Sequence, residues 1–325
     1  MPIKVSVIVP VYNPGAYIED CVSSLLRQSL PADEYELIFV DDGSTDDTPA
    51  RLDELAAEDP RVTVVHQENS GWSGKPRNVG IAAARGEYVM FVDNDDHLGD
   101  EALERMHDYG VAHDADVVVG KMAGQGRGVP VELFRRNHPR ATLESAPLID
   151  SLTPHKMFRR AFLDRIGLRF PEGRRRLEDH VFVTEAFLRA ANVSVLSDYV
   201  CYYHVRRDDA ANAGFQRFDP VGYFKNLREA LDVVERYTCL LYVYKRQGRT
   251  DARQAAAGHA RRLPQGDVPG DPRRGRRAVR ARRGERAPAH PASRGRADRR
   301  RPVRRCGGVR RVGGGRRAEG RTRGS

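Results

Sequence analysis

Two short acidic clusters follow two apolar segments of this chain, each at the point where a strand would end. Residues 41–42 (Asp-Asp) follow the apolar run 37–40, and residues 93–95 (Asp-Asn-Asp) follow the run 88–92. Apolar runs rich in β-branched and aromatic residues are typical of buried strands in a parallel sheet. Ligands of open α/β sheets bind at the carboxyl ends of the strands. We therefore expect both clusters to face one ligand, and a divalent cation carrying a phosphorylated ligand would offset their charge.

Strand and helix signals alternate along the first 120 residues. Apolar runs predict strands at 3–9, 36–40, 62–66, 87–92 and 116–120. Helical periodicity predicts helices at 16–27, 47–57, 77–84 and 101–113. We expect Ser44 or Thr45 to cap the second of these helices. The order predicts an α/β fold with a doubly wound, mostly parallel sheet flanked by helices.

The second half of the chain is less regular. Residues 177–190 predict an amphipathic helix, and residues 192–196 predict a strand that is followed by the aromatic run 199–203. Residues 154–162 should include a short strand or turn.

Basic residues are distributed unevenly. The chain as a whole carries a formal charge of +10, which suggests a nucleic-acid or anionic-membrane partner. Residues 248–325, however, contain 25 Arg, no Lys and six Asp or Glu, a net charge of about +19. Subtracting this from +10 leaves about −9 for residues 1–247. The segment expected to fold is therefore acidic.

The Arg/Gly-rich tail, residues 238–325, has an unusual composition. From Gly248 onward it lacks Ile, Phe, Tyr, Trp, Met, Asn and Lys, so it cannot bury a core and we predict disorder. Most of the missing residues have codons rich in A and T, whereas Arg, Gly, Ala and Pro have codons rich in G and C. We interpret the tail as out-of-frame translation that begins near residues 239–247. The alternative is a genuine RNA-binding arm, although such arms usually contain aromatic residues or Lys.

Cysteine usage and the apolar segments indicate the compartment. Cys21, Cys201, Cys239 and Cys306 show no paired spacing, which predicts neither a disulfide framework nor a zinc site and fits a reducing compartment. The apolar run 5–11 is too short to span a membrane and lacks the features of a signal peptide. We expect a cytoplasmic protein.

The residues after the first strand exclude two common nucleotide-binding folds. A dinucleotide-binding unit places GxGxxG there, whereas this chain has PVYNPG (10–15) with a single glycine. The sequence GxxxxGK[ST] is absent, which excludes a P-loop.

The two acidic clusters could bind complementary parts of a sugar nucleotide. Of Asp93 and Asp95, one could reach a ribose while the other ligates Mg²⁺ or Mn²⁺, ions that take carboxylate and phosphate oxygens. A carboxylate of FVDDGST (39–45) could accept hydrogen bonds from a base or ribose. The alternatives are a solvated acidic turn for the first motif and a helix-capping turn for the second.

Two further segments could complete a site. ENSGWSGKPRN (68–78) is a Gly-rich loop that leads into a helix, where Arg77 could contact a diphosphate. The alternative is an ordinary loop with a proline at the start of the helix. Glu178 and Asp179 start a predicted helix, and one of them could be a general base for an acceptor hydroxyl. Acids are also common there because they interact favourably with the helix dipole. We expect the preceding arginines 174–176 to be a solvated face.

Taken together, PVYN, VDDGS, NSG…RN, FVDNDD and LED resemble the inverting family 2 glycosyltransferases of GT-A fold. SGWSGKPRNVG, KMAGQGRGVP, LTPHKMFRRAFL, FPEGRRRLEDHVF and VSVLSDYVCYY resemble the enzymes that attach N-acetylglucosamine to poly(ribitol phosphate) wall teichoic acid. The resemblance covers roughly residues 3–237. It implies a catalytic domain at 1–237, with the nucleotide sugar bound by 1–120 and the acceptor and base in 121–237, ahead of the tail at 238–325.

The resemblance also implies roles for individual residues. Asp179 would be the general base, and Glu178 beside it would position the acceptor. Asp95, together with Asp93, would bind Mg²⁺ or Mn²⁺. The expected contacts to the UDP-sugar are made by Pro10, Tyr12, Asp41, Asn69, Arg77, Asp93 and Arg127.

The implied reaction moves a sugar, N-acetylglucosamine or a related hexose, from a UDP-sugar to a hydroxyl of a polymer or lipid-linked glycan, with inversion. After Tyr203 the chain reads VRRDDAANAG, where the teichoic acid enzymes carry a His and a Ser after a basic pair, and this leaves the sugar and the acceptor open. Peripheral association with the inner membrane face is compatible with such an acceptor, and no specific nucleic-acid partner is expected. The alternatives are a nucleotidyltransferase with a metal-bound acidic pair and a nucleic-acid-binding protein acting through its Arg-rich tail.

Overall fold

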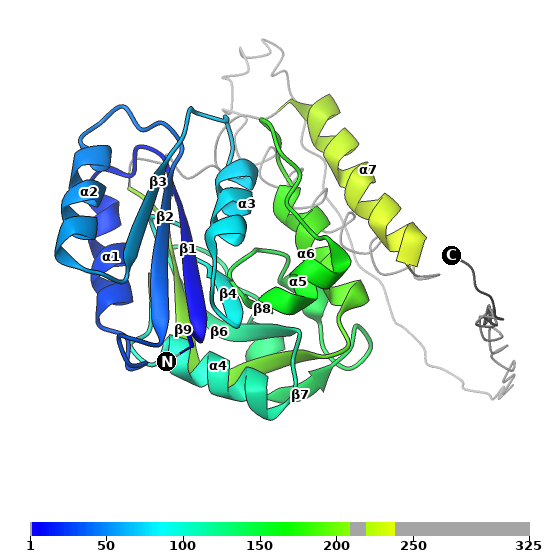
Figure 1. Ribbon diagram of the computed structural model, residues 1–325. Coiled ribbons are helices and arrows are strands. Elements are labelled where there is room, and N and C mark those ends of the chain that lie inside the picture. Colours follow the sequence, from blue (N-terminus) through cyan, green and yellow to red (C-terminus); the bar gives the residue numbers. More distant parts are fainter. Residues whose placement is uncertain (1, 209–218, 238–325) are drawn as a thin grey trace, which may run out of the picture. The chain divides into compact units, whose positions relative to one another are not determined.

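A mixed β-sheet runs through the part of the chain that the computed structural model describes, residues 2–208 and 219–237 (Figure 1). All of these residues belong to one unit, residues 1–264. The predictions made for the Arg/Gly-rich tail fall outside the described residues. The strands are β1 (Val5–Val11), β2 (Tyr35–Asp41), β3 (Val62–His66), β4 (Tyr88–Phe91), β5 (His97–Leu98), β6 (Val117–Gln125), β7 (His138–Ala141), β8 (Met157–Arg159) and β9 (Val193–Val205).

The strands follow the order β3-β2-β1-β4-β8-β6-β9-β5, and β7 also pairs with β9. β1 is parallel to β2 and β4, β2 is parallel to β3, and β6 is parallel to β9. The short β8 lies antiparallel between β4 and β6, and β5 and β7 are antiparallel to β9. Most paired residues are parallel, so the expected α/β fold is confirmed. Val11 pairs with Asp41 and Ile8 with Phe91, which brings the carboxyl ends of β1, β2 and β4 to one edge.

Helices flank the sheet. α3 packs on β1 and β2, α2 on β3, and α4 on β6 and β9. α7 runs along α6 (Figure 1) and buries Ala230, Val233 and Val234. The helices are α1 (Ile18–Leu26), α2 (Thr48–Glu58), α3 (Gly74–Ala83), α4 (Ala102–Ala112), α5 (Arg160–Ile166), α6 (Glu178–Arg189) and α7 (Pro220–Tyr237), with 3-10 turns η1 (Gly15–Tyr17), η2 (Val131–Phe134) and η3 (Leu148–Asp150).

A phenylalanine cluster joins the two halves of the unit beneath the site. Phe170 stacks on Phe182 of α6 with ring centroids 3.8 Å apart, and both contact Phe91 of β4 edge-on. Phe158 of β8 completes the cluster. Burying one such side chain stabilises a fold by about 1.5–3 kcal/mol, so the cluster holds the start of α6 firmly against β4.

The predicted capping of α2 by Ser44 or Thr45 is wrong. The residue that precedes α2 is Asp47, and it makes no side-chain cap hydrogen bond. Ser44 Oγ instead accepts a hydrogen bond from Asn13 N (3.1 Å), and Thr45 N donates to Asn13 Oδ1 (2.8 Å). These residues tie the loop after β2 to the loop after β1, because Asn13 sits in the left-handed backbone region (φ 44°) that Asn tolerates.

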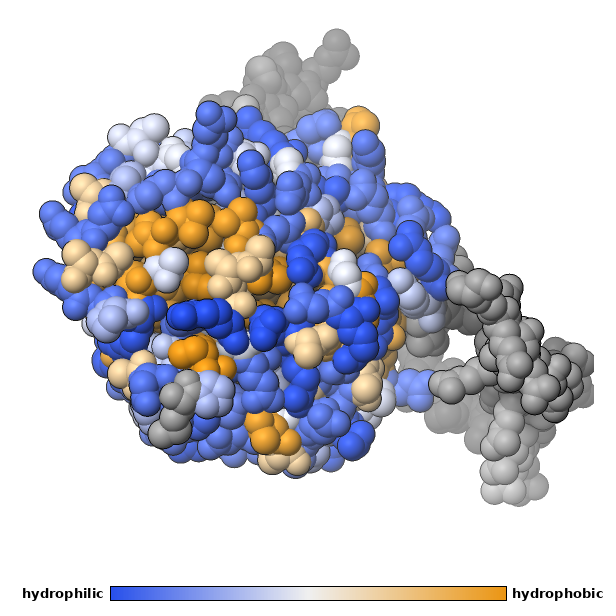
Figure 2. Space-filling view, viewed as in Figure 1, coloured by the Kyte–Doolittle hydropathy of each residue, from blue (hydrophilic) through white to orange (hydrophobic). Residues whose placement is uncertain are grey.

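Several predicted elements have different extents. The strand predicted at 192–196 and the aromatic run after it form one strand, β9, and α5, α7, β5 and β7 were not predicted at all. Among the described residues, no helix is both long enough and apolar enough to cross a membrane. Hydrophilic residues cover most of the face drawn in Figure 2, around one large hydrophobic area and several smaller ones, as the charged composition leads one to expect.

Candidate active site

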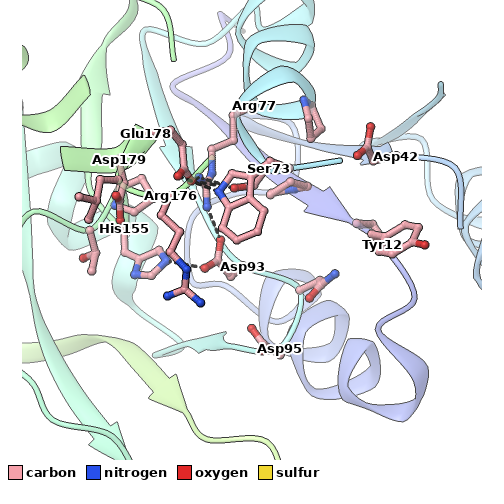
Figure 3. Close-up of a pocket in the computed structure, with 18 of the residues that line it drawn as sticks. Tyr12, Asp42, Ser73, Arg77, Asp93, Asp95, His155, Arg176, Glu178 and Asp179 are labelled. Atoms are coloured by element: carbon pink, nitrogen blue, oxygen red, sulfur yellow. Dashed lines mark hydrogen bonds and ion pairs between the residues drawn. The ribbon is translucent and has the colours of Figure 1, made fainter. Parts of the chain in front are cut away.

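A cavity of about 670 Å³ opens at the carboxyl ends of β1, β2 and β4. Figure 3 shows Tyr12 and Asp42 towards one end and Asp179 and His155 towards the other, with Asp93 and Arg77 between them. The structure thus brings both acidic clusters and the start of α6 to one site. Of the residues expected there, those that line the cavity are Pro10, Tyr12, Asn69, Arg77, Asp93, Asp95, Arg127, Glu178 and Asp179.

The two aspartates after β2 have different surroundings. Asp41 is buried and does not line the cavity: its Oδ1 accepts a hydrogen bond from Ser44 N (2.9 Å), and its Oδ2 lies 3.0 Å from His66 Nδ1. Burial opposes its ionisation, but Ser44 and His66 outweigh it and lower the pKa of Asp41. Asp42 lines the cavity and accepts hydrogen bonds from Ser70 N (3.0 Å) and Ser70 Oγ (2.9 Å). Both aspartates are 3% exposed, but only Asp42 lines the cavity, and Asp41 is held by Ser44 and His66.

Gly43 allows two loops to meet at the cavity edge. Its φ is +76°, and a Cβ atom added there would lie 2.8 Å from Asn69 N. Asn69 Nδ2 donates to the Asp42 carbonyl (2.8 Å), and its Oδ1 accepts a hydrogen bond from Gly71 N (2.9 Å). Only glycine fits this conformation and this close approach.

Arg77 joins Asp93, just after β4, to Glu178, at the start of α6. Its side chain is 4% exposed, with Nη2 2.8 Å from Asp93 Oδ1 and Nη1 3.1 Å from Glu178 Oε1 (Figure 3). Nη1 also donates to Ser73 Oγ (2.9 Å). A buried guanidinium between two carboxylates fixes both of them, because its planar fork offers several donors in fixed directions.

Asp93 is held on its second oxygen by His155, a residue that the sequence did not single out. The distance from Asp93 Oδ2 to His155 Nε2 is 3.0 Å, and the imidazole stacks on Tyr202 at 4.3 Å. Burial opposes ionisation of Asp93, but His155 and Arg77 hold its pKa well below the usual range. A histidine after a proline, ahead of a three-residue strand, is too weak a pattern to predict this contact.

The carboxylates of Asp93, Asp95 and Asp96 offer oxygen atoms within 4.8 Å of one another. Both oxygens of Asp93 already have partners, and Asp96 accepts hydrogen bonds from the Tyr202 hydroxyl (2.6 Å) and the Val205 amide (2.7 Å). Asp93 and Asp95, the two residues expected to bind the cation, line the cavity, whereas Asp96 does not.

The charge balance around Asp95 fits a divalent cation. Burial, together with the charge of Asp93, raises the pKa of Asp95 to about 6, against the opposing effect of Arg127 and Arg207. The site thus has an excess of negative charge that a cation would offset. An all-oxygen donor set of carboxylates is what Mg²⁺ and Mn²⁺ prefer.

Glu178 and Asp179 occupy the first turn of α6, directly after Leu177, whose φ of 63° lies in the left-handed region. Both oxygens of Glu178 are occupied: Oε1 by Ser73 Oγ (2.9 Å) and Arg77, and Oε2 by Trp72 Nε1 (2.8 Å). The left-handed backbone conformation of Leu177, which is uncommon for a residue other than glycine, is typical of a turn at a functional site.

Asp179 and Glu178 both line the cavity, but they differ in how many of their carboxylate oxygens accept hydrogen bonds. Its Oδ1 accepts hydrogen bonds from His180 N (2.8 Å) and pairs with His180 Nδ1 (2.9 Å), whereas Oδ2 has no hydrogen-bond partner among the described residues. Burial and the charge of Asp179 raise the pKa of Glu178. Burial acts against Asp179 as well, but His180 and Arg77 outweigh it and lower its pKa. Asp179 therefore combines a lowered pKa with an oxygen that has no hydrogen-bond partner among the described residues, the chemistry that a general base needs.

The expectation that arginines 174–176 form a solvated face fits the exposed Arg174, but it does not describe all three residues. Arg174 and Arg176 line the cavity, and Arg175 pairs with Glu229 of α7. A run of three arginines does not indicate which of them line a cavity, because the orientation of each side chain depends on the backbone turn that ends at Leu177.

The family model described as Glycosyl transferase family 2 matches residues 6–181. This chain belongs to glycosyltransferase family 2. That membership does not favour the nucleotidyltransferase or the nucleic-acid-binding alternative.

Two curated relatives of this chain come from Bacillus spizizenii and Staphylococcus aureus. It is 39% identical over 207 residues to a poly(ribitol-phosphate) β-glucosyltransferase of Bacillus spizizenii, an alignment that covers 63% of this chain and 33% of the relative. It is 40% identical over 206 residues to the poly(ribitol-phosphate) β-N-acetylglucosaminyltransferase TarS of Staphylococcus aureus, covering 63% of this chain and 36% of TarS. The chain thus matches only about a third of the length of these relatives.

A solved structure gives the same picture. Residues 1–349 of S. aureus TarS in complex with UDP-GlcNAc superpose with a TM-score of 0.69 at 34% identity, covering 74% of this chain and 69% of that one. The expected GT-A fold is confirmed by this likeness.

Proposed function

We propose that this chain is a metal-dependent, inverting glycosyltransferase that moves N-acetylglucosamine or a related hexose from a UDP-sugar to a hydroxyl of a poly(ribitol phosphate)-like polymer. The observation that carries the proposal is Asp179, which lines the same cavity as Asp95 and Arg127 and whose Oδ2 has no hydrogen-bond partner among the described residues. The named activities of the Bacillus and Staphylococcus relatives support the choice of donor and acceptor.

The donor would lie along the cavity with its uridine at the Tyr12 end. Tyr12 is 49% exposed, so its ring can stack on a base, and Asp42 and Asn69 offer hydrogen-bonding groups nearby. The diphosphate would then reach Arg127 and Arg207, and the sugar would lie towards Asp179. This orientation places the donor mainly in the segment 1–120.

The reaction would be a single displacement. Asp179 Oδ2 takes the proton from an acceptor hydroxyl as that oxygen forms a bond to the anomeric carbon. The bond from this carbon to the diphosphate oxygen breaks on the opposite side, and UDP leaves with the bonding electrons. Attack from the face opposite the leaving group inverts the configuration, and general-base help of this kind is worth about 10²–10⁴-fold.

Asp95 would hold Mg²⁺ or Mn²⁺, which supplies charge stabilisation for the departing diphosphate when bound. Arg127 and Arg207 line the same cavity and would add fixed positive charge there.

The acceptor would bind beside α6. Arg174 and Arg176 line the cavity next to the proposed base, where a phosphate group of a polymer could pair with a guanidinium. This arrangement assigns the acceptor to the segment 121–237. The compartment and any association with a membrane remain predictions from the sequence.

The Asp179→Asn variant tests the proposal. Its amide cannot take a proton, so transfer of sugar from UDP-GlcNAc or UDP-glucose to poly(ribitol phosphate) should fall by at least about 10²-fold. UDP should bind as in the wild type, which the fluorescence of the single tryptophan, Trp72 in the cavity, reports directly. Glu178→Gln should be milder, and Asp33→Asn, at an exposed position, is the matched control. Normal transfer by Asp179→Asn would contradict the proposal, as would pyrophosphate rather than UDP as the product.

A further inference from the structure

His180 makes both hydrogen bonds that the structure gives the proposed base. Its backbone N–H and its ring Nδ1 approach the same atom, Asp179 Oδ1, at 2.8 and 2.9 Å. Both side chains are about a quarter exposed, at 23% each, and both line the cavity. The two contacts restrain rotation of the carboxylate about its Cβ–Cγ bond and leave Oδ2 as the oxygen without a hydrogen-bond partner among the described residues.

The neighbouring carboxylate shows that these contacts are specific. Glu178 also lies in the first turn of α6, but its oxygens are occupied by Trp72, Ser73 and Arg77, which belong to the loop before α3 and to α3 itself. The two adjacent carboxylates therefore have separate hydrogen-bond partners: Asp179 is held by His180 on α6, and Glu178 by residues of α3 and of the loop before it.

Charged groups approach Asp179 from every element around it. Glu178 and His180 lie beside it on α6, Arg77 reaches it from α3, and Lys156 approaches from the residues before β8. Lys156 is fully buried, its Nζ donates to the Thr153 carbonyl, and burial lowers the pKa of Lys156 to about 7. Burial would raise the pKa of Asp179, and His180 is the largest effect that opposes it, ahead of Arg77.

We propose that His180 is a positioning residue for the base: it fixes Asp179 Oδ1 and thereby presents Oδ2 to the acceptor hydroxyl. The inference rests on the proposed function. A carboxylate that samples several orientations meets the hydroxyl in only some of them, and holding reacting groups in line is a large part of enzymatic rate enhancement. The rival assignment makes His180 the base and Asp179 its orienting partner, as in histidine–carboxylate pairs of hydrolases.

The experiment compares His180→Asn with His180→Leu in the full-length chain. The Asn amide can donate a hydrogen bond to Oδ1 but carries no charge, whereas Leu removes both the bond and the charge. The control is His113→Asn, because His113 follows the last residue of α4 and does not line the cavity. For each variant we would measure kcat against pH, UDP binding through Trp72 fluorescence, and thermal unfolding, with Asp179→Asn in parallel.

We expect His180→Leu to lower kcat at least about tenfold with UDP affinity unchanged, because only the geometry of the base is lost. His180→Asn should recover most of this loss. In both variants the acid limb of the profile should move to higher pH, since a positive charge that favours the ionised carboxylate is gone. If His180→Leu does not fold, the inference is tested by His180→Asn alone, through the shift of the acid limb in its profile of kcat against pH.

Two outcomes would overturn the inference. Wild-type rates and an unmoved acid limb in both variants would show that the contact has no role. A loss in both variants as deep as that of Asp179→Asn, without rescue by Asn, would make His180 the base. If instead Asp179→Asn itself transfers sugar normally, the proposed function fails, and the inference fails with it.

Discussion

Replacing Arg77 by Met should destabilise the fold far more than removing an ordinary surface arginine. The substitution keeps most of the side-chain length but leaves Asp93 and Glu178 without their shared cation. The Arg77 and Glu178 side chains are 4% and 7% exposed, so water cannot take over the lost contacts.

The size of the effect follows from this burial. Removing one member of a buried ion pair costs about 3–5 kcal/mol, because the other charge stays buried and uncompensated. For a folded unit of this size, 1 kcal/mol shifts the melting temperature by about 2–4 °C, so we expect a drop of about 6–20 °C at pH 7. Arg135→Met is the matched control: Arg135 is 72% exposed and pairs with Glu132 on the same turn, and such pairs contribute at most about 1 kcal/mol.

The deficit of Arg77→Met should shrink in acid. Burial and Asp179 already raise the pKa of Glu178, and loss of Arg77 raises it further above the unfolded value of about 4.3. A carboxyl group with a raised folded-state pKa contributes stability below its unfolded pKa and loses it as the pH rises through the folded one. The difference between variant and wild type should therefore be largest at neutral pH and smaller near pH 4.

Thermal unfolding followed by circular dichroism at several pH values measures both effects. Adding Glu178→Gln to Arg77→Met should recover part of the loss at neutral pH, because the orphaned charge is removed. The reasoning is refuted if Arg77→Met melts within a few degrees of Arg135→Met, or if its deficit does not depend on pH.

Three shorter predictions follow from other parts of the molecule. Asp95→Asn should abolish the Mn²⁺-dependent part of UDP-sugar binding, seen by tryptophan fluorescence, while the melting temperature changes little; unchanged metal dependence would assign the ion elsewhere. Gly43→Ala should cost about 1–3 kcal/mol in unfolding experiments and weaken UDP binding, since a Cβ would press on Asn69 N at 2.8 Å; a stable variant would mean that the loops can separate. Truncation after Tyr237 should leave the unfolding transition intact, because the residues from Gly248 onward offer almost no apolar side chains; a large loss of stability would contradict the sequence interpretation.

Parallel strands and the helices between them could be predicted from the sequence because each has a local pattern. β3 was predicted with its observed bounds, and the strand before Asp93 was placed within one residue at each end. β8 lies within residues 154–162, where a short strand or turn was predicted, but β5, with two residues, is too short for any periodicity to show. Their positions depend on pairing with distant strands, which a local pattern does not contain.

The sequence predicts a site residue where both its chemical type and its position at a strand end point to a ligand. It does not do so where tertiary contacts determine which side chains line the cavity. Carboxylates at strand ends indicate a ligand, so Asp93 and Asp95 were found. Asp41 and Asp42 have the same residue type and neighbouring positions, and only the contacts of Asp41 with Ser44 and His66 show which of them turns away from the cavity. His155 became visible only when the fold placed it against Asp93.

The donor side and the proposed base are linked by a short covalent path. Glu178 is tied to Trp72 and Ser73 of the donor-side loop and to Arg77, and the next residue in the chain is Asp179. Because Glu178 and Asp179 are adjacent in the chain, we expect any shift of the loop before α3 that moves Glu178 to change the orientation of Asp179 as well. The hydrogen bonds of His180 act on the opposite side of this linkage and resist such a rotation. The orientation of the proposed base thus depends on contacts from two separate parts of the fold. Glu178 takes its partners from the loop before α3 and from α3, whereas Asp179 takes its partners from His180 on α6.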